Sequence, residues 1–364
     1  MIEAQLPPDW RQLAEEHGVV KPVPPQLGAK LNDPALVLRL ILHHVALGVS
    51  LKVTCAMAAA ANLVRISAVS LHLRMRSSGA WLAAMLSKMT AASASFHASL
   101  WAGFELVIAD ATVVTRPGAK GTTARVHYVL RLSDLALIQC EVTDEHGGET
   151  VRRFHVIPGQ LWLLDRGYAN PPGIAALYLA EAAVLVRYNF GSLPLYDVYG
   201  QRIDVRSKVL RLRKVGRARE WAAYVHPDKS SPITGRLCAV RLPNEKASEA
   251  RARLRKEHGN DVTEEALEMA DFVIVFTTVP KDTLSLDRIL ELYRLRWQVE
   301  LKIKRDKSIG GLDTLPNFRS DTIHAWICAK LLAQQIAHRL TTPQVAFPPS
   351  AIGRYSLPLP AQAA

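Results

Sequence analysis

Two short apolar runs, each ending at an aspartate, constrain the fold of this chain more than any other feature of its sequence. Residues 106–109 stop at Asp110, and residues 161–164 stop at Asp165. Short apolar runs bounded by polar residues are typical of buried strands. An acid at the end of such a strand lies where ligands bind in an open sheet. For either aspartate taken alone, a turn or a helix cap is the alternative role.

The segments between and after these runs predict further strands. Residues 125–132 and 135–142 are rich in Val, Leu and Ile and are separated by a tight turn, which predicts a hairpin. The next predicted elements are a strand, a helix, a strand and a returning strand, at 151–156, 171–181, 183–187 and 272–277. Antiparallel strands followed by a strand–helix–strand unit predict an α/β fold, a mixed sheet with flanking helices.

A single helix is predicted for residues 286–308, which contain no proline or glycine and follow a potential N-cap serine. At about 100° per residue, four of its polar side chains fall within about 60° of one another on one face. They are Tyr293, Arg296, Glu300 and Lys307. One carboxylate among phenol, guanidinium and ammonium groups suits a site where metal and phosphate meet. A solvated salt-bridge face is the alternative.

The three acids Asp110, Asp165 and Glu300 could together form a carboxylate cluster. Hard oxygen ligands of this kind suit Mg²⁺ or Mn²⁺. Two such ions activate a water or hydroxyl and stabilise the leaving oxygen in phosphoryl transfer. The three acids therefore predict a metal-dependent nuclease or strand transferase. Their spacing alone does not show that they converge.

The net charge of +12 and the pI near 9.7 predict a polyanionic partner. Nucleic acid is the first candidate and an anionic membrane surface the second. A hydrophobic content of 49% excludes a disordered chain and is ample for a core in a chain of 364 residues.

The remaining composition indicates a cytoplasmic protein. The four cysteines are far apart and form no C-x-x-C pair, so we expect buried thiols in a reducing compartment. The histidines show no spacing typical of zinc sites, and the acidic, proline-rich N-terminus is not a secretory signal. The longest apolar run, 35–53, is interrupted by charged residues and histidines, which predicts a core helix rather than a membrane span.

The N-terminal region after residue 33 has a helical pattern throughout. Its segments 51–61 and 66–76 are compatible with a helix-turn-helix, in which Arg65, Arg74 and Arg76 could touch phosphate. A plain helical bundle with surface arginines is the alternative.

A basic segment lies between the second aspartate and the glutamate. Residues 202–219 hold eight Lys or Arg against one acid, Asp204, within short strand-like pieces. Apolar residues between the cations could leave the charge on an open face. Charged helices are predicted for residues 244–271.

Combined motifs of the chain resemble the insertion-sequence-four family of bacterial DDE transposases. The spacing Tyr293-x-x-Arg296-x-x-x-Glu300-x(6)-Lys307 matches the Y-R-E-K signature of that family at every step. The segment Asp110-Ala-Thr resembles the first acid block of that family. The segments 147–168 and 195–200 are similar to the second block and to the start of the insertion found in the same enzymes.

The resemblance implies an organisation around a ribonuclease-H-like core. That core would comprise residues 99–190 and 272–341. The other implied parts are a helical DNA-binding domain, a basic β-rich insertion with charged helices, and a proline-rich tail, at 1–98, 191–271 and 342–364.

The resemblance also implies DNA cleavage at transposon ends and joining to target DNA, in a bacterial, nucleoid-associated protein. Asp110, Asp165 and Glu300 would hold two Mg²⁺ or Mn²⁺ ions. The signature residues Tyr293, Arg296 and Lys307 would contact end DNA. We therefore expect Glu300 to point at the two aspartates and Arg296 not to neutralise it.

Enzymes of this group often use a hairpin intermediate with a flipped base. Trp221, in the insertion, is a candidate to stack on that base, and a core tryptophan is the alternative. A homodimer is expected in the synaptic complex. Relatives dimerise through a longer C-terminal helical region, and the 57 residues after Lys307 put that route in doubt.

Two other functions stay open. One is a catalytically inactive DNA-binding relative, such as an inhibitor of transposition. The other is a ribonuclease-H-like nuclease without strand transfer, which would not need the Tyr–Arg–Lys face. The presence of all three acids and the complete face favours the transposase.

Overall fold

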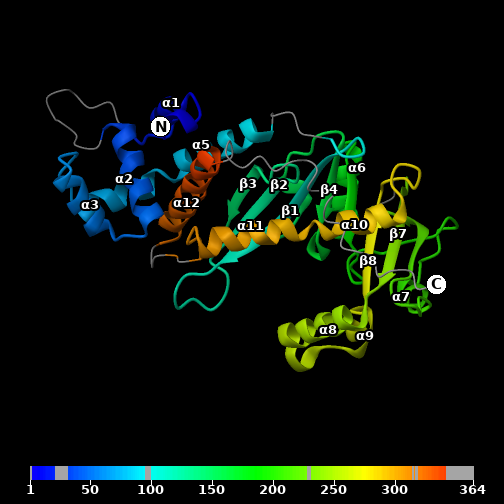
Figure 1. The fold of residues 1–364 in the computed structure, drawn as a ribbon. Helices are drawn as coiled ribbons and strands as arrows, with labels where there is room; N and C mark the ends of the chain where they lie inside the picture. The colour runs from blue at the N-terminus through cyan, green and yellow to red at the C-terminus, as the bar shows by residue number, and fades with distance from the viewer. Residues whose placement is uncertain are drawn as a thin grey trace. The chain divides into compact units, whose positions relative to one another are not determined.

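The computed structural model describes residues 2–20, 32–94, 100–227, 231–313, 315 and 319–341. Its strands are β1 (Glu105–Val114), β2 (Ala124–Arg131), β3 (Leu137–Thr143), β4 (Gln160–Leu164), β5 (Ala183–Arg187), β6 (Ala218–Val225), β7 (Ile233–Arg241) and β8 (Phe272–Thr277). They form one sheet in the order β3-β2-β1-β4-β5-β8-β7-β6 (Figure 1). Strand β4 pairs in parallel with β1 and β5, whereas β5–β8, β8–β7, β7–β6 and β2–β3 are antiparallel. The prediction of a mixed sheet is therefore confirmed.

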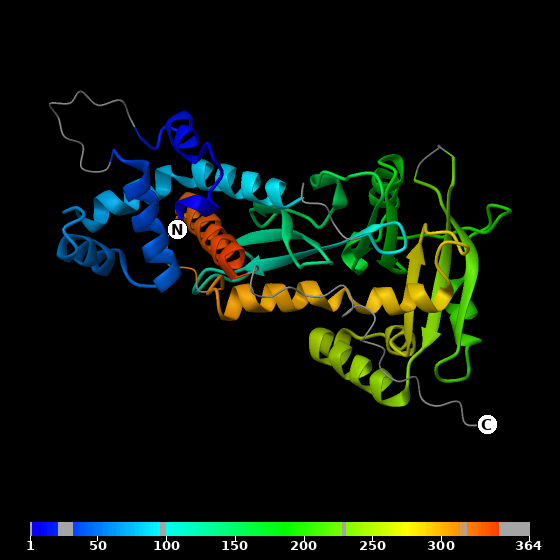
Figure 2. The same cartoon turned by 45° about the horizontal axis from the view of Figure 1, so that its top comes forward.

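The chain divides into two compact units, and the first comprises residues 1–99, 111–147 and 300–364. Its helices are α1 (Trp10–Glu16), α2 (Pro34–Leu47), α3 (Leu51–Ala60), α4 (Ala68–Ser77), α5 (Gly79–Ala94) and α12 (Ser320–Thr341). Helices α5 and α12 pack on each other and on β3 (Figure 2). The indole of Trp81 is fully buried and donates a hydrogen bond to the carbonyl of Trp10, which ties α1 to this core.

Helix α2 shows how the sequence sets a helix boundary. The Asp33 side chain accepts a hydrogen bond from the backbone N–H of Ala35, and Pro34 occupies the first helical position. Gly48 ends the helix with a φ of 65°, a conformation that glycine adopts without strain. No helix among the described residues is long and apolar enough to cross a membrane.

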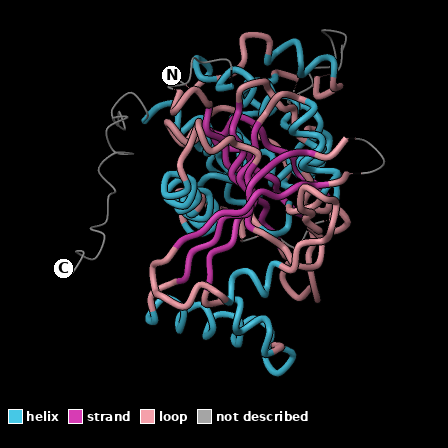
Figure 3. Tube along the Cα trace, turned by 90° about the vertical axis from the view of Figure 1, so that its right-hand side faces the viewer, coloured by secondary structure: helices cyan, strands magenta, loops and turns pink. Residues whose placement is uncertain are grey.

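The second unit comprises residues 100–110 and 148–299. It holds β4 to β8, the first part of β1, and helices α6 (Pro171–Leu179), α7 (Val205–Leu210), α8 (Asn244–His258), α9 (Glu264–Met269) and α10 (Leu286–Arg294). Strand β7 pairs along β8, so the predicted insertion extends the core sheet. Helices α8 and α9 connect β7 to β8 and lie beyond the ends of these strands (Figures 1 and 3).

Two predicted elements were wrong. Residues 151–156 contain a 3₁₀ helix, Val151–Arg153, because Thr150 caps it and Arg153 donates to the carbonyl of Gly148. The helix predicted for 286–308 is broken, because α10 ends at Arg294 and α11 (Trp297–Ser308) begins three residues later. At the break, the backbone N–H groups bond to carbonyls three residues back instead of four.

The four cysteines are free, as predicted. Cys55, Cys238 and Cys328 are buried, and Cys140 is partly buried. The proline-rich tail predicted for 342–364 lies outside the described residues.

Candidate active site

The parallel pairing of β1 and β4 brings the two predicted aspartates together. Glu105 lies opposite Gln160 and Ile108 opposite Leu163, and the same register places Asp110 level with Asp165. The apolar residues that precede each aspartate are buried, with at most 4% exposed. Asp165 follows the last residue of β4, so its carboxylate emerges at the carboxyl end of that strand, where open sheets bind ligands. The prediction that a strand ends near Asp110 was wrong, because β1 continues through Asp110 to Val114.

Arg296 lies between these two carboxylates. Its Nη1 atom is 3.6 Å from Oδ2 of Asp110 and 3.9 Å from Oδ2 of Asp165. Arg296 is one of the two residues in the break between α10 and α11. The residue that interrupts the helix is therefore the one whose guanidinium contacts both aspartates. Arg296 was predicted to contact DNA from one face of a helix. In the described structure its guanidinium contacts the two aspartates.

Tyr293 is buried in the last turn of α10, with only 6% of the residue exposed. Burial raises the pKa of Tyr293 well above its usual value, and the negative charge of Asp165 adds to that rise. The phenol is therefore neutral at physiological pH. The Tyr293 hydroxyl lies close enough to Asp165 to feel its charge, and it can donate a hydrogen bond.

Glu300 and Lys307 both lie on α11, in the first unit. They are seven residues apart, about two helical turns, so they share one face. Glu300 is exposed and Lys307 is half-buried. No group of three His, Cys, Asp or Glu side chains in the described part of the chain is arranged to hold a metal ion. The meeting of Glu300 with the aspartates therefore remains a prediction.

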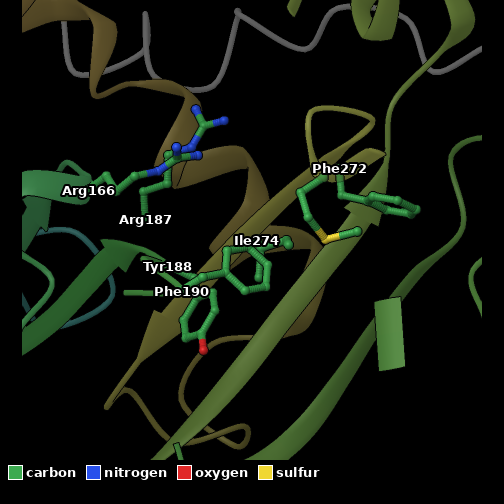
Figure 4. Close-up of a pocket in the computed structure, with 7 residues that line it drawn as sticks. Arg166, Arg187, Tyr188, Phe190, Phe272 and Ile274 are labelled. Atoms are coloured by element: carbon green, nitrogen blue, oxygen red, sulfur yellow. The ribbon is translucent and has the colours of Figure 1, made fainter. Parts of the chain in front are cut away.

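A pocket near Asp165 was missed by the sequence reasoning. Its lining residues are Arg166, Arg187, Tyr188, Phe190, Met269, Phe272 and Ile274. Figure 4 shows the guanidinium groups of Arg166 and Arg187 close to one another. Burial and then the charge of Arg187 lower the pKa of Arg166. In the described structure neither guanidinium makes a salt bridge or side-chain hydrogen bond, which leaves a doubly cationic end suited to an anion.

The other part of the pocket is aromatic. The rings of Tyr188 and Phe190 meet edge to face, with centroids 4.8 Å apart and an interplanar angle of 78°. Burial raises the pKa of Tyr188 to about 12. Cations beside aromatic rings can bind the phosphate and the base of one nucleotide. Neighbouring strand ends build this pocket, so no local motif could have revealed it.

A buried arginine fixes the loop that leads into α10. The guanidinium of Arg236 on β7 donates to the carbonyls of Val279 and Leu284, at 2.9 and 2.8 Å. It also pairs with Glu220 at 2.6 Å, and Glu220 contacts Lys281 at 3.0 Å. These bonds satisfy a buried cation and set the start of the helix that carries Tyr293.

The turn after Asp165 brings Gly167 close to the side chain of Glu149. A Cβ atom at Gly167 would lie 2.0 Å from Oε2 of Glu149, so any larger residue would displace that carboxylate. Glu149 belongs to the Gly-Gly-Glu segment that resembles the second acid block. The side chain of Glu149 therefore lies against the turn that follows Asp165.

Two of the three arginines predicted to touch phosphate in the N-terminal region are engaged within the first unit. Arg74 donates to the carbonyl of Val19 at 2.7 Å. Arg76 pairs with Asp321 at 2.6 Å. These contacts favour the helical-bundle alternative for these two residues, whereas Arg65 is exposed.

Trp221 is half-buried on β6, the last strand of the sheet. The ammonium of Lys208 lies 5.9 Å from the centre of its ring. Trp221 is therefore not a core tryptophan. The Lys208 ammonium lies beside the Trp221 ring, which is the candidate for base stacking.

Comparison with known proteins agrees with this geometry. Residues 101–336 match the transposase DDE domain family. The chain is 31% identical over 332 residues to the putative transposase InsL for insertion sequence element IS186A of Escherichia coli K12, a match that covers 89% of each chain. It is also 31% identical over 333 residues to the transposase for insertion sequence element IS421 of Escherichia coli, again with 89% of each chain covered.

The fold and the paired aspartates define a ribonuclease-H-like domain. The chain belongs to the transposase DDE domain family. The resemblance to insertion-sequence-four transposases is thereby confirmed.

Proposed function

We propose that this protein cleaves the ends of an insertion sequence and joins them to target DNA by phosphoryl transfer. The main support is the position of Asp110 and Asp165, which lie level with each other where the parallel pairing of β1 and β4 ends and contact one guanidinium. Family membership makes DNA the substrate. The proposal assigns catalysis to these two aspartates and Glu300.

The donor set fits hard divalent cations. Asp110 and Asp165 each have a carboxylate oxygen within 4 Å of the Arg296 guanidinium, so a cation is accommodated between the two side chains. We assign two Mg²⁺ or Mn²⁺ ions to Asp110, Asp165 and Glu300. When bound, such ions lower the pKa of a water or hydroxyl and neutralise charge on the reacting phosphate.

The remaining residues bind and orient DNA. Arg296 holds the two aspartates while the site is free of DNA, and it can then exchange a carboxylate for a phosphate oxygen. Tyr293 is neutral and donates a hydrogen bond to end DNA. Lys307, on the same face of α11 as Glu300, contributes a positive charge to a phosphate of the end.

The pocket offers charge for a DNA phosphate. Arg166 and Arg187 supply this charge, whereas the rings of Tyr188 and Phe272 are buried. If the reaction includes a hairpin intermediate, the half-buried Trp221 is the candidate to stack on its flipped base.

The other parts of the chain support this chemistry. We assign recognition of the inverted repeats to the N-terminal region 1–98 and catalysis to 99–190 and 272–341, which the insertion 191–271 interrupts. A homodimer bridges the two ends, in the bacterial cytoplasm on the nucleoid.

A labelled inverted-repeat duplex tests the proposal directly. Purified protein with Mg²⁺ should nick the duplex at the repeat boundary and join it to a plasmid. Binding without nicking or joining would sink the enzyme proposal and favour an inactive relative or an inhibitor. Nicking without joining would instead favour a nuclease.

A further inference from the structure

A dense basic surface on the second unit has no role in the catalytic proposal above. It spans residues 211–219, which run from the end of α7 into β6, and is called here the basic loop. Its five cations are all exposed: Arg211, Arg213, Lys214, Arg217 and Arg219. The only acids near it in sequence are Asp204 and Glu220.

Those two acids are already engaged elsewhere. Asp204 accepts hydrogen bonds from Ser207 at the start of α7. Glu220 pairs with Arg236 and Lys281. Within the described structure, the side chains of these five residues make no ion pair and no hydrogen bond. Their charges therefore repel one another without an internal counter-charge, which is the condition that a phosphate backbone relieves.

By contrast, neighbouring basic residues have structural partners. Arg206 on α7 pairs with Glu265 and Glu268 of α9, at 2.8 and 2.7 Å. Arg241 on β7 contacts Asp271 at 4.0 Å. The unpaired charge is thus concentrated in the basic loop and is not a general property of this region.

The backbone of the basic loop is anchored at one end of the sheet. Arg241 donates from its side chain to the carbonyl of Arg213, and its own carbonyl accepts from the N–H of Gly216. The apolar side chain of Leu212 is buried, with 1% exposed. The loop therefore presents its cations from a fixed backbone, so less entropy is lost on binding.

The same anchor connects the loop to the pocket. The guanidinium of Arg241 lies 5.9 Å from the ring centre of Phe272, which lines the pocket. Phe272 begins β8 and Arg241 ends β7, and the two residues pair in the sheet. A DNA strand whose phosphate lies at Arg166 and Arg187 can therefore continue toward the basic loop.

We propose that the basic loop binds target DNA through its phosphates, independently of base sequence. Its side chains suit this role because long cationic side chains contact phosphates, whereas amide side chains read bases. The loop contains no Asn or Gln. Target DNA varies in sequence, while the inverted repeats do not, so a surface of cations alone fits the target. This inference rests on the proposed transposase function.

The test neutralises three of these cations in the full chain, with Arg213, Arg217 and Arg219 changed to Gln. Strand transfer of pre-cleaved ends into plasmid should need at least about tenfold more plasmid for half-maximal joining. For a random-sequence duplex, the slope of log affinity against log salt should fall by about 3. Nicking of intact inverted-repeat DNA and affinity for it should stay at the wild-type level.

Two matched variants control this test. Arg253, Arg255 and Lys256 are exposed on α8, and their change to Gln removes the same charge elsewhere. Equal loss of target affinity in this control would overturn the proposal, because net charge alone would then explain the effect. Changing Arg213, Arg217 and Arg219 to Lys keeps the charge and should preserve the salt slope.

The outcomes also separate this inference from the proposed function. If the Gln variant loses inverted-repeat binding as strongly as plasmid capture, the basic loop binds end DNA and the target assignment is wrong. If wild-type protein neither nicks nor joins DNA, the proposed function fails, and the salt slope on the random duplex still tests phosphate binding by the loop.

Discussion

Replacing Arg296 with Gln should destabilise the protein in the absence of divalent cations and should make its stability depend on Mg²⁺. The change removes the positive charge between Asp110 and Asp165 and leaves two carboxylates facing each other. Two neighbouring negative charges without a counter-charge destabilise the fold, and a bound divalent cation relieves their repulsion. Mg²⁺ should therefore stabilise the variant more than it stabilises the wild-type protein.

The size of the effect follows from the geometry of Arg296. At 3.6 and 3.9 Å, each attraction amounts to about 4 kcal/mol at the effective dielectric constant of a protein surface. Solvent screens the pair with Asp165, whose side chain is 40% exposed, to about 1 kcal/mol. The side chain of Asp110 is 18% exposed, so solvent screens its attraction to Arg296 less. We expect the free energy of unfolding to fall by about 2–3 kcal/mol in total.

Urea unfolding with and without Mg²⁺, followed by tryptophan fluorescence, measures this loss. Arg294→Gln is the matched control, because Arg294 is exposed at the end of α10 and should change stability by less than about 0.5 kcal/mol. Equal stability of the Arg296 variant and wild type without Mg²⁺, or an equal gain from Mg²⁺ in both proteins, would refute the assigned role of Arg296.

Further predictions concern DNA binding, the α10 loop and pH. Lys307→Ala should weaken end binding and lower its salt slope by about 1; an unchanged slope in a binding titration would argue against a phosphate contact. Arg236→Met should lower the free energy of unfolding by about 3 kcal/mol, because it leaves two buried carbonyls without their donor and removes one of the two cations that pair with Glu220; a loss below about 0.5 kcal/mol in urea unfolding would contradict this role. Burial lowers the pKa values of three histidines in the first unit, His44, His324 and His338. Their folded pKa values lie below the unfolded value, so the stabilisation is present above about pH 6.5 and is lost as pH falls. Urea midpoints that do not change between pH 7.5 and 5.5 would contradict this.

The parts of the fold that the sequence predicted are those in which burial and local pattern agree. The apolar runs 106–109 and 161–164 lie in buried strands, although β1 continues past Asp110 to Val114. The hairpin of β2 and β3 forms in antiparallel register. The boundaries of β5 and β8 match the predicted ranges, 183–187 and 272–277. In each case a short apolar segment lies between polar residues or turns, so its length and its burial are set locally.

The break before α11 could not be predicted from local sequence, because residues 286–308 contain no helix breaker. The turn at Leu295 and Arg296 accompanies contacts between Arg296 and two aspartates that are distant in the chain. Helical periodicity also placed Tyr293 on a polar face, although its ring is buried. Tertiary contacts override local propensity at these positions.

The pocket was also invisible in the sequence. Its cations, Arg166 and Arg187, belong to separate strand ends, and Phe272 comes from a strand that returns after the insertion. Only the strand order β4-β5-β8 brings them together. Periodicity assigns residues to faces, but it does not determine which strand ends become neighbours.

The most direct test of the central claim compares three single variants, Asp110→Asn, Asp165→Asn and Glu300→Gln, on labelled inverted-repeat DNA with Mg²⁺. If the three acids act as one catalytic centre, each change should reduce cleavage by roughly 10⁴-fold while end binding stays at the wild-type level. A Glu300→Gln variant that still cleaves would contradict the account. So would one that loses binding and cleavage equally, because Glu300 would then support structure and not chemistry.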